Sequence, residues 1–400
     1  MPSGKKLTQR LLPAFFCLLS LLMVACGSNG TSGASSTATK APDNKQIFIY
    51  AQWGVSDIKT FDPGMTTDQP SAEAINMVFT GLVSLDDQLR VVPQMASSWD
   101  VSSDHLAYTF HLKSGLQFSD GSKLDANDVA YSIDRSLSPA INNQSGVGLT
   151  YLGLIKGSTD RTTGKVKTII GTGVVVQDPN TLVINLTQPG GYFLQALTYP
   201  TSYVVEKSVA DKFGTRWTDH LAGQGGDGPF MVKSYSHTTG IKLVPNPHYY
   251  GSKPQLAEVD YLPFKDRQTS YNAYQANQND YSDIPLAQVA SIKSGKDFVQ
   301  TPALTIFYVG MNFLVKPLDN IMVRQAFALA VDRDVLNQAA WHGAYIPSCH
   351  IVPQGMPGYN ANLTCPAGTT TKGDVAKAKQ LFTQGLQEEG MTPATFPNIT

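Results

Sequence analysis

The chain has 400 residues, with 30 Lys and Arg against 31 Asp and Glu, and a formal net charge of −1. This near neutrality argues against a nucleic-acid-binding protein, which would carry a basic face. Charged residues make up only 15% of the chain, whereas Tyr and Phe number 17 each. Such a composition suits a large core or an aromatic-lined cleft equally well, so composition alone does not choose between them.

The N-terminus has the three parts of a secretory signal peptide. Lys5, Lys6 and Arg10 supply positive charge, and residues 11–24 are almost wholly apolar. A charged start, a short apolar stretch and a small residue before the cut are typical of a segment removed during export. The apolar stretch is shorter than the roughly 20 residues that span a bilayer, which disfavours an uncleaved membrane anchor. We therefore predict a signal peptide over residues 1–25.

Cys26 is the predicted site of lipid attachment. The segment from Met23 to Cys26 resembles the bacterial lipobox, in which the cysteine becomes the first mature residue, although Met23 stands where Leu is usual. Two or more acyl chains hold a protein stably at a membrane. Residues 26–45 are rich in Ser, Thr, Gly and Ala, which favours a flexible tether. We expect an extracytoplasmic protein anchored to the cell membrane, at its periplasmic or outer face; the alternative is that Cys26, like Cys17, is an ordinary signal-peptide residue.

The body begins with short alternating elements. Residues 47–51 form an apolar run that predicts a buried strand, and residues 71–79 have helical spacing, with Ser71 as a possible cap. Residues 108–112 alternate apolar and polar side chains, as a half-buried strand does. Asp125 is the predicted N-cap of the helix that follows.

Further strands and a glycine-rich loop are expected in the second half. Residues 182–186 alternate again, and residues 229–232 and 241–244 look like paired strands. Residues 223–228 contain four glycines without the spacing of a phosphate loop, so we expect a close backbone approach or a hinge-side loop. The apolar, β-branched and aromatic run at residues 305–313 predicts a central strand.

Three helices are expected near the C-terminus. Asp319 or Asn320 would cap the first and Asp332 the second, while residues 375–386 share an apolar face and Gly390 stands where a helix ends. The mixed order of helices and strands predicts an α/β or α+β fold.

Cys349 and Cys365 are the two cysteines expected to remain in the mature body beyond Cys26. In an exported protein a disulfide is the default, and a loop of this size is stabilised by about 3 kcal/mol in the chain-entropy model. A metal site using Cys349, His350 and Cys365 is the alternative, but no second close pair of ligands accompanies it.

Catalytic signatures are absent from the sequence. There is no Gly-x-Ser-x-Gly elbow, no Gly-x-x-x-x-Gly-Lys-Ser/Thr loop, no His-Glu-x-x-His pair and no Cys-x-x-Cys pair, and the seven histidines are scattered. We therefore predict a protein that is not an enzyme and that uses no cofactor or metal.

Several motifs, in order from about residue 47 onward, resemble one family. The most specific block runs through the strand at 108–112, the Phe-Ser-Asp-Gly turn at 118–121 and the helix start at 128–132. The supporting blocks are Thr60–Pro63, Val92–Trp99, Gly226–Phe230 (with Asp227 in place of the usual Thr), Asn246–Tyr250, Val323–Arg333 and Asp374–Gly390. Together they are similar to the extracytoplasmic solute-binding proteins of the peptide, oligopeptide and nickel class, which feed ATP-driven importers.

The resemblance implies an α/β fold of the two-lobed, type II periplasmic-binding-protein kind, with an extra N-terminal subdomain. Family members usually run past this length, so the C-terminal lobe is expected to be incomplete, and the acidic residue that receives a peptide amino terminus in some members is not assigned. The implied parts are lobe I in residues 46–90 and 201–304, its inserted subdomain in residues 91–200, and a partial lobe II in residues 305–400.

The same resemblance implies a monomer that captures peptides and delivers them to a membrane permease with its ATPase subunits. Another solute, such as an oligosaccharide, an opine or a nickel chelate, is the first alternative, and a receptor or scaffold lipoprotein is the second. The expected ligand-binding residues are Gln52, Trp53, Gly228, Tyr308, Met311 and Asn312. For Trp53 and Tyr308, ordinary core packing is an equal alternative.

Overall fold

The computed structural model describes residues 41–397 except 301–304, 355, 357 and 366–369. The predicted signal peptide, Cys26 and most of the predicted tether lie outside the described residues. Within the described part of the chain, no helix is both long enough and apolar enough to cross a membrane.

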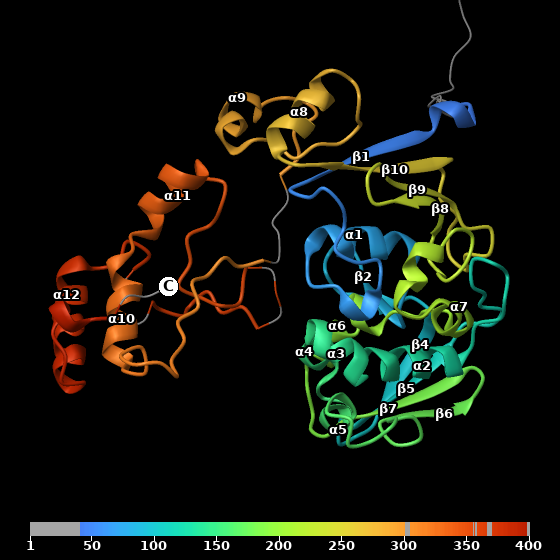
Figure 1. Cartoon of the computed structure of the whole chain (residues 1–400), viewed down its shortest axis with the longest axis horizontal. Coiled ribbons are helices and arrows are strands. Elements are labelled where there is room, and N and C mark those ends of the chain that lie inside the picture. The colour runs from blue at the N-terminus through green and yellow to red at the C-terminus, as the bar shows by residue number, and fades with distance from the viewer. Residues whose placement is uncertain (1–40, 301–304, 355, 357, 366–369, 398–400) are drawn as a thin grey trace, which may run out of the picture. The chain divides into compact units, whose positions relative to one another are not determined.

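The first sheet has four strands in the order β1-β10-β9-β8 (Figure 1). Their bounds are Ile47–Trp53 for β1, Glu258–Phe264 for β10, Gly240–Pro245 for β9 and Phe230–Ser236 for β8. β1 and β10 are parallel, whereas β9 is antiparallel to both its neighbours. Helix α1 (Gln69–Val78) packs near β8, and α8 (Arg267–Gln275) packs against β1 and β10. The expected strand at 47–51 and the expected pair at 229–232 and 241–244 are thus confirmed.

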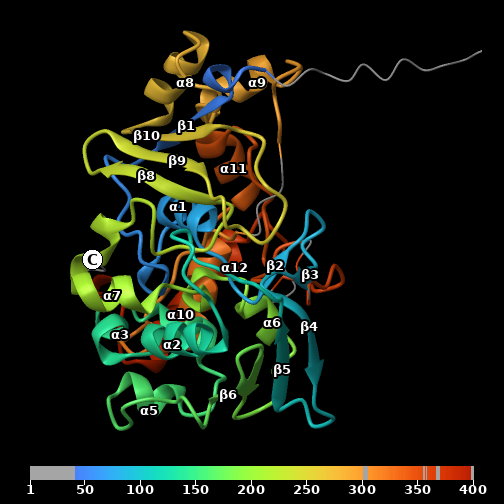
Figure 2. The ribbon, with the colours of Figure 1, turned by 90° about the vertical axis from the view of Figure 1, so that its right-hand side faces the viewer.

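The second sheet is wholly antiparallel, in the order β4-β5-β7-β6. Its strands are Ala96–Val101, Ala107–Leu112, Thr181–Asn185 and Val174–Asp178, in that order. Helix α2 (Ala126–Ser136) packs against β6 and β7. Figure 2 shows α2 on the same half of the body as β4, β5 and β6. Asp125 caps α2 with a reciprocal capping box to Asp128, as the sequence predicted. A separate two-stranded ribbon joins β2 (Val83–Leu85) and β3 (Val91–Pro93).

Each four-stranded sheet carries its own hydrophobic core. Phe110, Ile133 and Leu182 are fully buried in the core of the second sheet. Phe79 and Leu243 are fully buried in the core of the first sheet. Each such side chain contributes about 1.5–3 kcal/mol relative to exposure. Burial alternates strictly along β5, whereas the three central residues of β7 are all buried.

Shorter helices complete the chain before residue 300. The α-helices are α3 (Pro139–Ser145), α4 (Val147–Leu152), α5 (Ser158–Thr162), α6 (Phe193–Ala196), α7 (Lys207–Phe213) and α9 (Val289–Ile292). The 3-10 helices there are η1 (Asp43–Lys45), η2 (Pro63–Met65), η3 (Pro200–Ser202), η4 (Gly214–His220) and η5 (Leu286–Gln288).

The C-terminal part contains α10 (Ile321–Ala330), α11 (Arg333–Trp341), α12 (Val375–Glu388) and the 3-10 helix η7 (Pro393–Thr395). Asn320 caps α10 and Asp332 caps α11, each accepting backbone N–H groups. α10 packs on α12, where Val323 and Leu386 are fully buried. Gly390 has a positive φ of 67° just after α12, as a helix terminator does.

Two predicted elements are wrong. Residues 305–312 form no strand and are largely exposed, with Phe307 at 70% and Val309 at 89%. A strand needs a hydrogen-bonded neighbour, and none of the described strands pairs with this run, so its β propensity is not realised. The N-cap of α1 is Asp68 rather than Ser71, because the Asp68 carboxylate accepts the Ser71 N–H and the Ser71 side chain is buried.

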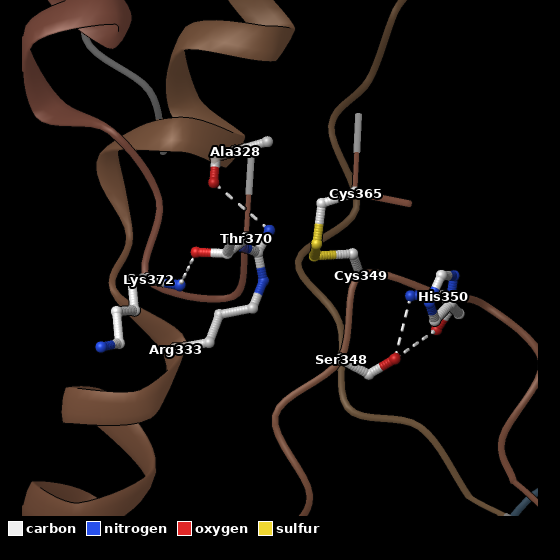
Figure 3. Close-up of a disulfide and its surroundings, with 8 residues drawn as sticks. All are labelled: Ala328, Arg333, Ser348, Cys349, His350, Cys365, Thr370 and Lys372. Atoms are coloured by element: carbon white, nitrogen blue, oxygen red, sulfur yellow. Dashed lines mark hydrogen bonds between the residues drawn. A yellow bond between two sulfur atoms is a disulfide. The ribbon is translucent and has the colours of Figure 1, made fainter. Parts of the chain in front are cut away.

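Cys349 and Cys365 are joined in a disulfide, with their Cα atoms 5.2 Å apart (Figure 3). The bridge closes a 16-residue separation in an irregular segment that follows α11. A disulfide occupies both sulfur atoms, so it removes the thiolates that the alternative metal site needs. Among the described residues no group of three or more His, Cys, Asp or Glu side chains is arranged to hold a metal ion.

Candidate ligand-binding site

The carboxyl end of β1 lies beside the N-terminal half of α1, and Gln52 joins the two. The Gln52 side chain is only 5% exposed and donates from Nε2 to the Pro70 carbonyl oxygen at 2.8 Å. The same nitrogen lies 3.4 Å from Glu73 Oε2. Trp53 is the last residue of β1 and pairs with Phe264 of β10. Two of the predicted ligand residues therefore end the parallel strand pair.

Glu73 is the centre of a polar cluster that sequence analysis missed. Its carboxylate accepts a hydrogen bond from Tyr50 Oη at 3.0 Å and another from Gln69 Nε2 at 2.7 Å, besides the longer contact from Gln52. Glu73 itself is half-buried, and no ion pair to Lys, Arg or His is found for it within the described part of the chain. The cluster thus holds a carboxylate with neutral donors.

Aromatic rings line the same cluster. The Tyr50 ring stacks on Tyr281 with centroids 4.7 Å apart and planes at 6°, and its other neighbour is Tyr261, also at 4.7 Å. Burial raises the pKa of Tyr50, and the Glu73 charge raises it further, so Tyr50 stays a protonated donor. Tyr281 remains 38% exposed.

Gly228 serves the framework of the first sheet. Its N–H donates to the Val78 carbonyl at the end of α1 at 2.8 Å, and its own carbonyl accepts from Asn246 Nδ2 at 2.9 Å. A Cβ at this position would lie 2.5 Å from the Val78 carbonyl carbon, so only glycine fits. The close backbone approach expected for the glycine-rich loop is confirmed at this residue.

Asp227, one residue earlier, is a fully buried carboxylate without a cationic partner among the described residues. It accepts the Thr80 N–H at 2.9 Å and the Thr80 hydroxyl, and Tyr250 Oη donates to Thr80 Oγ1 at 2.9 Å. Burial raises the pKa of Asp227 to about 7, and the bonds from Thr80 act against that rise. This network ties the glycine-rich loop to the end of α1.

Asp62, from the Thr-Phe-Asp-Pro motif, is buried, and its negative charge is balanced by a cationic partner and by hydrogen-bond donors. It pairs with Arg135 of α2 through both oxygens, accepts from Trp217 Nε1 at 3.0 Å, and also accepts the Gly64 N–H at 3.0 Å. Burial lowers the pKa of Arg135, but the charge of Asp62, its hydrogen bond and further nearby groups together outweigh burial, so the net shift of the pKa is upward. The motif therefore joins the first core to α2 rather than facing a ligand.

The remaining predicted residues lie together in the irregular segment before α10. Tyr308 is 78% exposed, and Met311 packs against the small cluster around Leu318. The Asn312 side chain accepts the Leu314 N–H at 3.0 Å, which shapes a turn. Their grouping with Gln52 and Trp53 in one binding site stays a prediction.

One signal in the sequence points to Tyr50, although not to Glu73. Tyr50 precedes Gln52 by two residues, so both side chains lie on one face of β1. Glu73 reaches them only through the placement of α1 against the strand, a tertiary relation that neither periodicity nor capping reveals.

Comparison with known proteins defines the class of this chain. The family described as bacterial extracellular solute-binding proteins, family 5, middle part, matches residues 90–396. The chain belongs to this family, which is non-enzymatic and whose members bind solutes outside the cytoplasm.

Named relatives sharpen this picture. The chain is 27% identical to the oligopeptide-binding protein OppA of Bacillus subtilis, over 96% of this chain and 70% of that protein. It is 28% identical to the probable deoxycholate-binding periplasmic protein YgiS of Escherichia coli, over 88% and 66%. It is also 28% identical to the periplasmic oligopeptide-binding protein OppA of Salmonella typhimurium, over 80% and 60%. The chain thus spans 60–70% of the length of these relatives.

Solved structures agree on the fold. An oligopeptide-binding protein of Borrelia burgdorferi superposes with a TM-score of 0.70 at 28% identity, over 85% of this chain and 66% of that one. The murein tripeptide binding protein MppA of Escherichia coli gives 0.74 at 22% identity, over 87% and 67%. The predicted α/β fold of the periplasmic-binding-protein kind is confirmed.

Proposed function

We propose that this protein captures peptides outside the membrane and delivers them to the permease of an ATP-driven importer. The observation that carries the proposal is that relatives named for oligopeptide and dipeptide binding align over 96% of this chain. Peptides are held largely through main-chain hydrogen bonds, which lets one site accept many side chains. The division into two lobes that close on the ligand, with boundaries as predicted from the sequence, belongs to this proposal.

A different solute is the second candidate, because similar relatives are named for deoxycholate and for glutathione. One titration separates the candidates. The purified chain is heated with trialanine, glutathione, deoxycholate, a nickel–histidine chelate or maltotriose, and its melting temperature is recorded. A ligand at a hundred times its dissociation constant stabilises by about 2.7 kcal/mol, which gives a clear shift. We expect a shift with the peptide, whereas a shift with only one of the other solutes would reassign the substrate.

Lipid anchoring through Cys26 completes the proposal and has a matched control in the chain. Cys26→Ser removes the acylated residue, while Cys17→Ser changes an equivalent residue within the predicted signal peptide. Because the lipid holds the mature protein at the membrane, Cys26→Ser is expected to move it to the soluble fraction and abolish radioactive palmitate incorporation. The Cys17→Ser variant is expected to remain labelled and membrane-bound; equal labelling of both variants would contradict the anchor.

A further inference from the structure

The glycine-rich loop at residues 223–228 is bonded to the parts of the body that carry both four-stranded sheets. The Gly226 carbonyl accepts the Ser119 N–H at 2.8 Å, and Ser119 lies in the turn between β5 and α2, on the side of the second sheet. The Asp227 N–H donates to the Val78 carbonyl at 3.1 Å, at the end of α1, which packs near β8 of the first sheet. This short loop is therefore a joint between the two sheets.

The Asp227 carboxylate fastens the joint to the end of α1. One oxygen accepts the Thr80 N–H at 2.9 Å and the other accepts the Thr80 hydroxyl. A Cβ at Gly226 would lie 2.4 Å from the Val78 carbonyl oxygen, so the backbones of the loop and of α1 are in close contact. Asp227 is 0% exposed, and within the described residues no cation pairs with it.

Asp134 is the matched case in the second sheet's core. Its carboxylate also accepts a buried backbone N–H, that of Ile169, at 2.8 Å, but two nitrogens of Arg161 face it at 3.0 Å. Taking an ionised group out of water is costly unless a cation or several donors compensate it. The charge of Asp134 is compensated inside the protein, whereas an ionised Asp227 has only the two donors of Thr80.

This difference gives the joint a direction of response to pH. Burial raises the pKa of Asp227 to about 7, against 3.8 for an aspartate in water. When the loop opens and Asp227 reaches water, the carboxyl releases its proton near the lower value, while the closed form still holds it. The open form therefore gains stability relative to the closed one as the pH rises from about 4 to 7, with no further gain above that.

Other titratable groups surround the joint. Tyr203, Tyr249 and Tyr250 lie near Asp227, and burial raises the pKa of each phenol, so none of them ionises between pH 4 and 7. Glu206 accepts a backbone N–H of the loop at 3.0 Å and therefore needs a control of its own. Farther out are Lys113 over the Tyr250 ring, Asp120 in the turn that holds Ser119, and His248 beside Gly121.

We propose that residues 223–228 form a pH-sensitive joint, in which loss of the proton from the Asp227 carboxylate loosens the loop from the end of α1 and from the turn at Ser119. The joint is fastened in acidic surroundings and loosened toward neutrality. Thr is usual at this position of the motif that the chain resembles, so the device belongs to this chain's own residue. It does not depend on which solute the protein binds.

Amide hydrogen exchange, followed residue by residue by NMR on the full mature chain, measures the opening at pH 4.5, 6 and 7.5. Each rate is divided by the intrinsic rate of an unprotected amide at the same pH. The N–H groups of Thr80, Gly228 and Ser119 report on the joint, and the Ile169 N–H is the internal control. In the wild type, protection of the three reporters is expected to fall by about tenfold or more from pH 4.5 to 7.5. At pH 7.5 it should lie below that of Ile169, because a local opening needs less free energy than global unfolding.

Three variants assign the response to one group. Asp227→Asn cannot ionise, and Asp227→Thr introduces the residue that is usual in the motif, so both are expected to make the protection of the reporters independent of pH. Asp227→Thr keeps the test decisive if Asp227→Asn does not fold. Glu206→Gln removes the other acid at the loop and is expected to keep the wild-type fall.

The outcomes decide between a local joint and a general loss of stability. A fall at the three reporters that is abolished by the Asp227 variants and kept by Glu206→Gln supports the joint. If the reporters are as protected as Ile169 at pH 7.5, the loop opens only when the whole protein unfolds, and the inference is overturned. It is also overturned if the fall persists in the Asp227 variants or disappears in Glu206→Gln, because Asp227 is then not the controlling group.

Discussion

Two buried acids in neighbouring parts of the body are compensated in opposite ways. Asp62 is 4% exposed and is balanced by Arg135 and by hydrogen bonds from neutral donors. Asp227 is fully buried and accepts hydrogen bonds from the backbone N–H and the hydroxyl of Thr80. Both belong to sequence motifs of the family, yet one is a charge pair and the other a carboxylate whose protonation is favoured by burial. Burial alone therefore does not predict whether an acid in such a motif is charged.

The largest effect on the free energy of unfolding is expected at Asp62, the acid that has a cationic partner. Arg135→Met leaves the Asp62 carboxylate buried without its cation, and breaking such a pair costs about 3–5 kcal/mol. We expect that loss in the free energy of unfolding, measured by urea denaturation. The double variant Asp62→Asn with Arg135→Met removes both charges and should recover much of the loss. If the double variant is no more stable than Arg135→Met, the pair does not act as a compensated unit.

The second prediction concerns the uncompensated acid and the direction of its pH dependence. The pKa of Asp227 is about 7 in the folded protein, against an ordinary value of 3.8 for an aspartate in water, so the folded chain holds a proton that the unfolded chain has released. Stability contributed by Asp227 is therefore full below about pH 4 and is lost as the pH rises toward 7. Asp227→Asn cannot ionise, so its stability relative to the wild type should increase with pH across this window.

Urea denaturation at pH 4.5, 6 and 8 measures this trend directly. One pKa unit corresponds to about 1.4 kcal/mol, so the relative change is on the order of a few kcal/mol. The slope with pH decides the outcome, because any constant cost of the amide cancels. The nearby phenols of Tyr203 and Tyr250 have pKa values raised by burial and do not titrate in this range. A difference that stays constant with pH would show that Asp227 is already charged when folded.

A smaller effect is expected at the hydroxyl that serves Asp227. Thr80→Val keeps the shape of the side chain but removes the donor to Asp227 and the acceptor for Tyr250 Oη. Leaving buried polar groups without partners costs about 1–3 kcal/mol. Because an ionised Asp227 needs the donor more than a protonated one, the cost should be greater at pH 8 than at pH 5. An equal cost at the two pH values would show that the contribution of the Thr80 hydroxyl does not depend on whether Asp227 is ionised.

Much of the local structure was predictable from short-range patterns. The caps at Asp125 and Asn320 and the alternation at 108–112 depend on neighbouring residues, and all appear in the structure. The compensation of the acids was not predictable in this way. Asp62 and Arg135 are 73 residues apart in the sequence, and Thr80 and Asp227 are 147 residues apart. Only the folded chain brings the members of each pair into contact. Ring clusters such as Tyr50 with Tyr281 have the same origin.

The strand expected at 305–313 failed for a related reason. Its composition favours a strand, but pairing requires a partner, and none of the described strands lies against it. The role of Gln52 in a binding site stays a prediction, which its place after the apolar run of β1 suggested. Its neighbour Glu73 looks like any polar residue of an amphipathic helix until α1 is placed beside β1.

The smallest expected effect is at a half-buried acid, Asp57, whose partner His237 is exposed, and this pair extends the comparison to the surface. Asp57 contacts His237 Nδ1 at 2.5 Å and accepts from Tyr235 Oη, while Asp219 faces the other ring nitrogen at 3.4 Å. The hydrogen bond to Asp57 raises the pKa of His237. Its stabilising contribution is thus full below the unfolded pKa near 6.5 and is lost as the pH rises through the higher folded value.

His237→Gln should therefore destabilise more at pH 5.5 than at pH 8.5, which is the same sign of pH dependence as for Asp227→Asn but with a smaller amplitude. The His237 side chain is 62% exposed, so solvent screens the pair and the difference should stay below about 1 kcal/mol. Raising the salt concentration to about 1 M should reduce the difference further at this site, because exposed pairs are screened and buried ones much less. A salt-insensitive difference at His237 would mean that the surface cluster is held as tightly as the buried pair of Asp62 and Arg135, and the ordering of the three acids by burial would no longer hold.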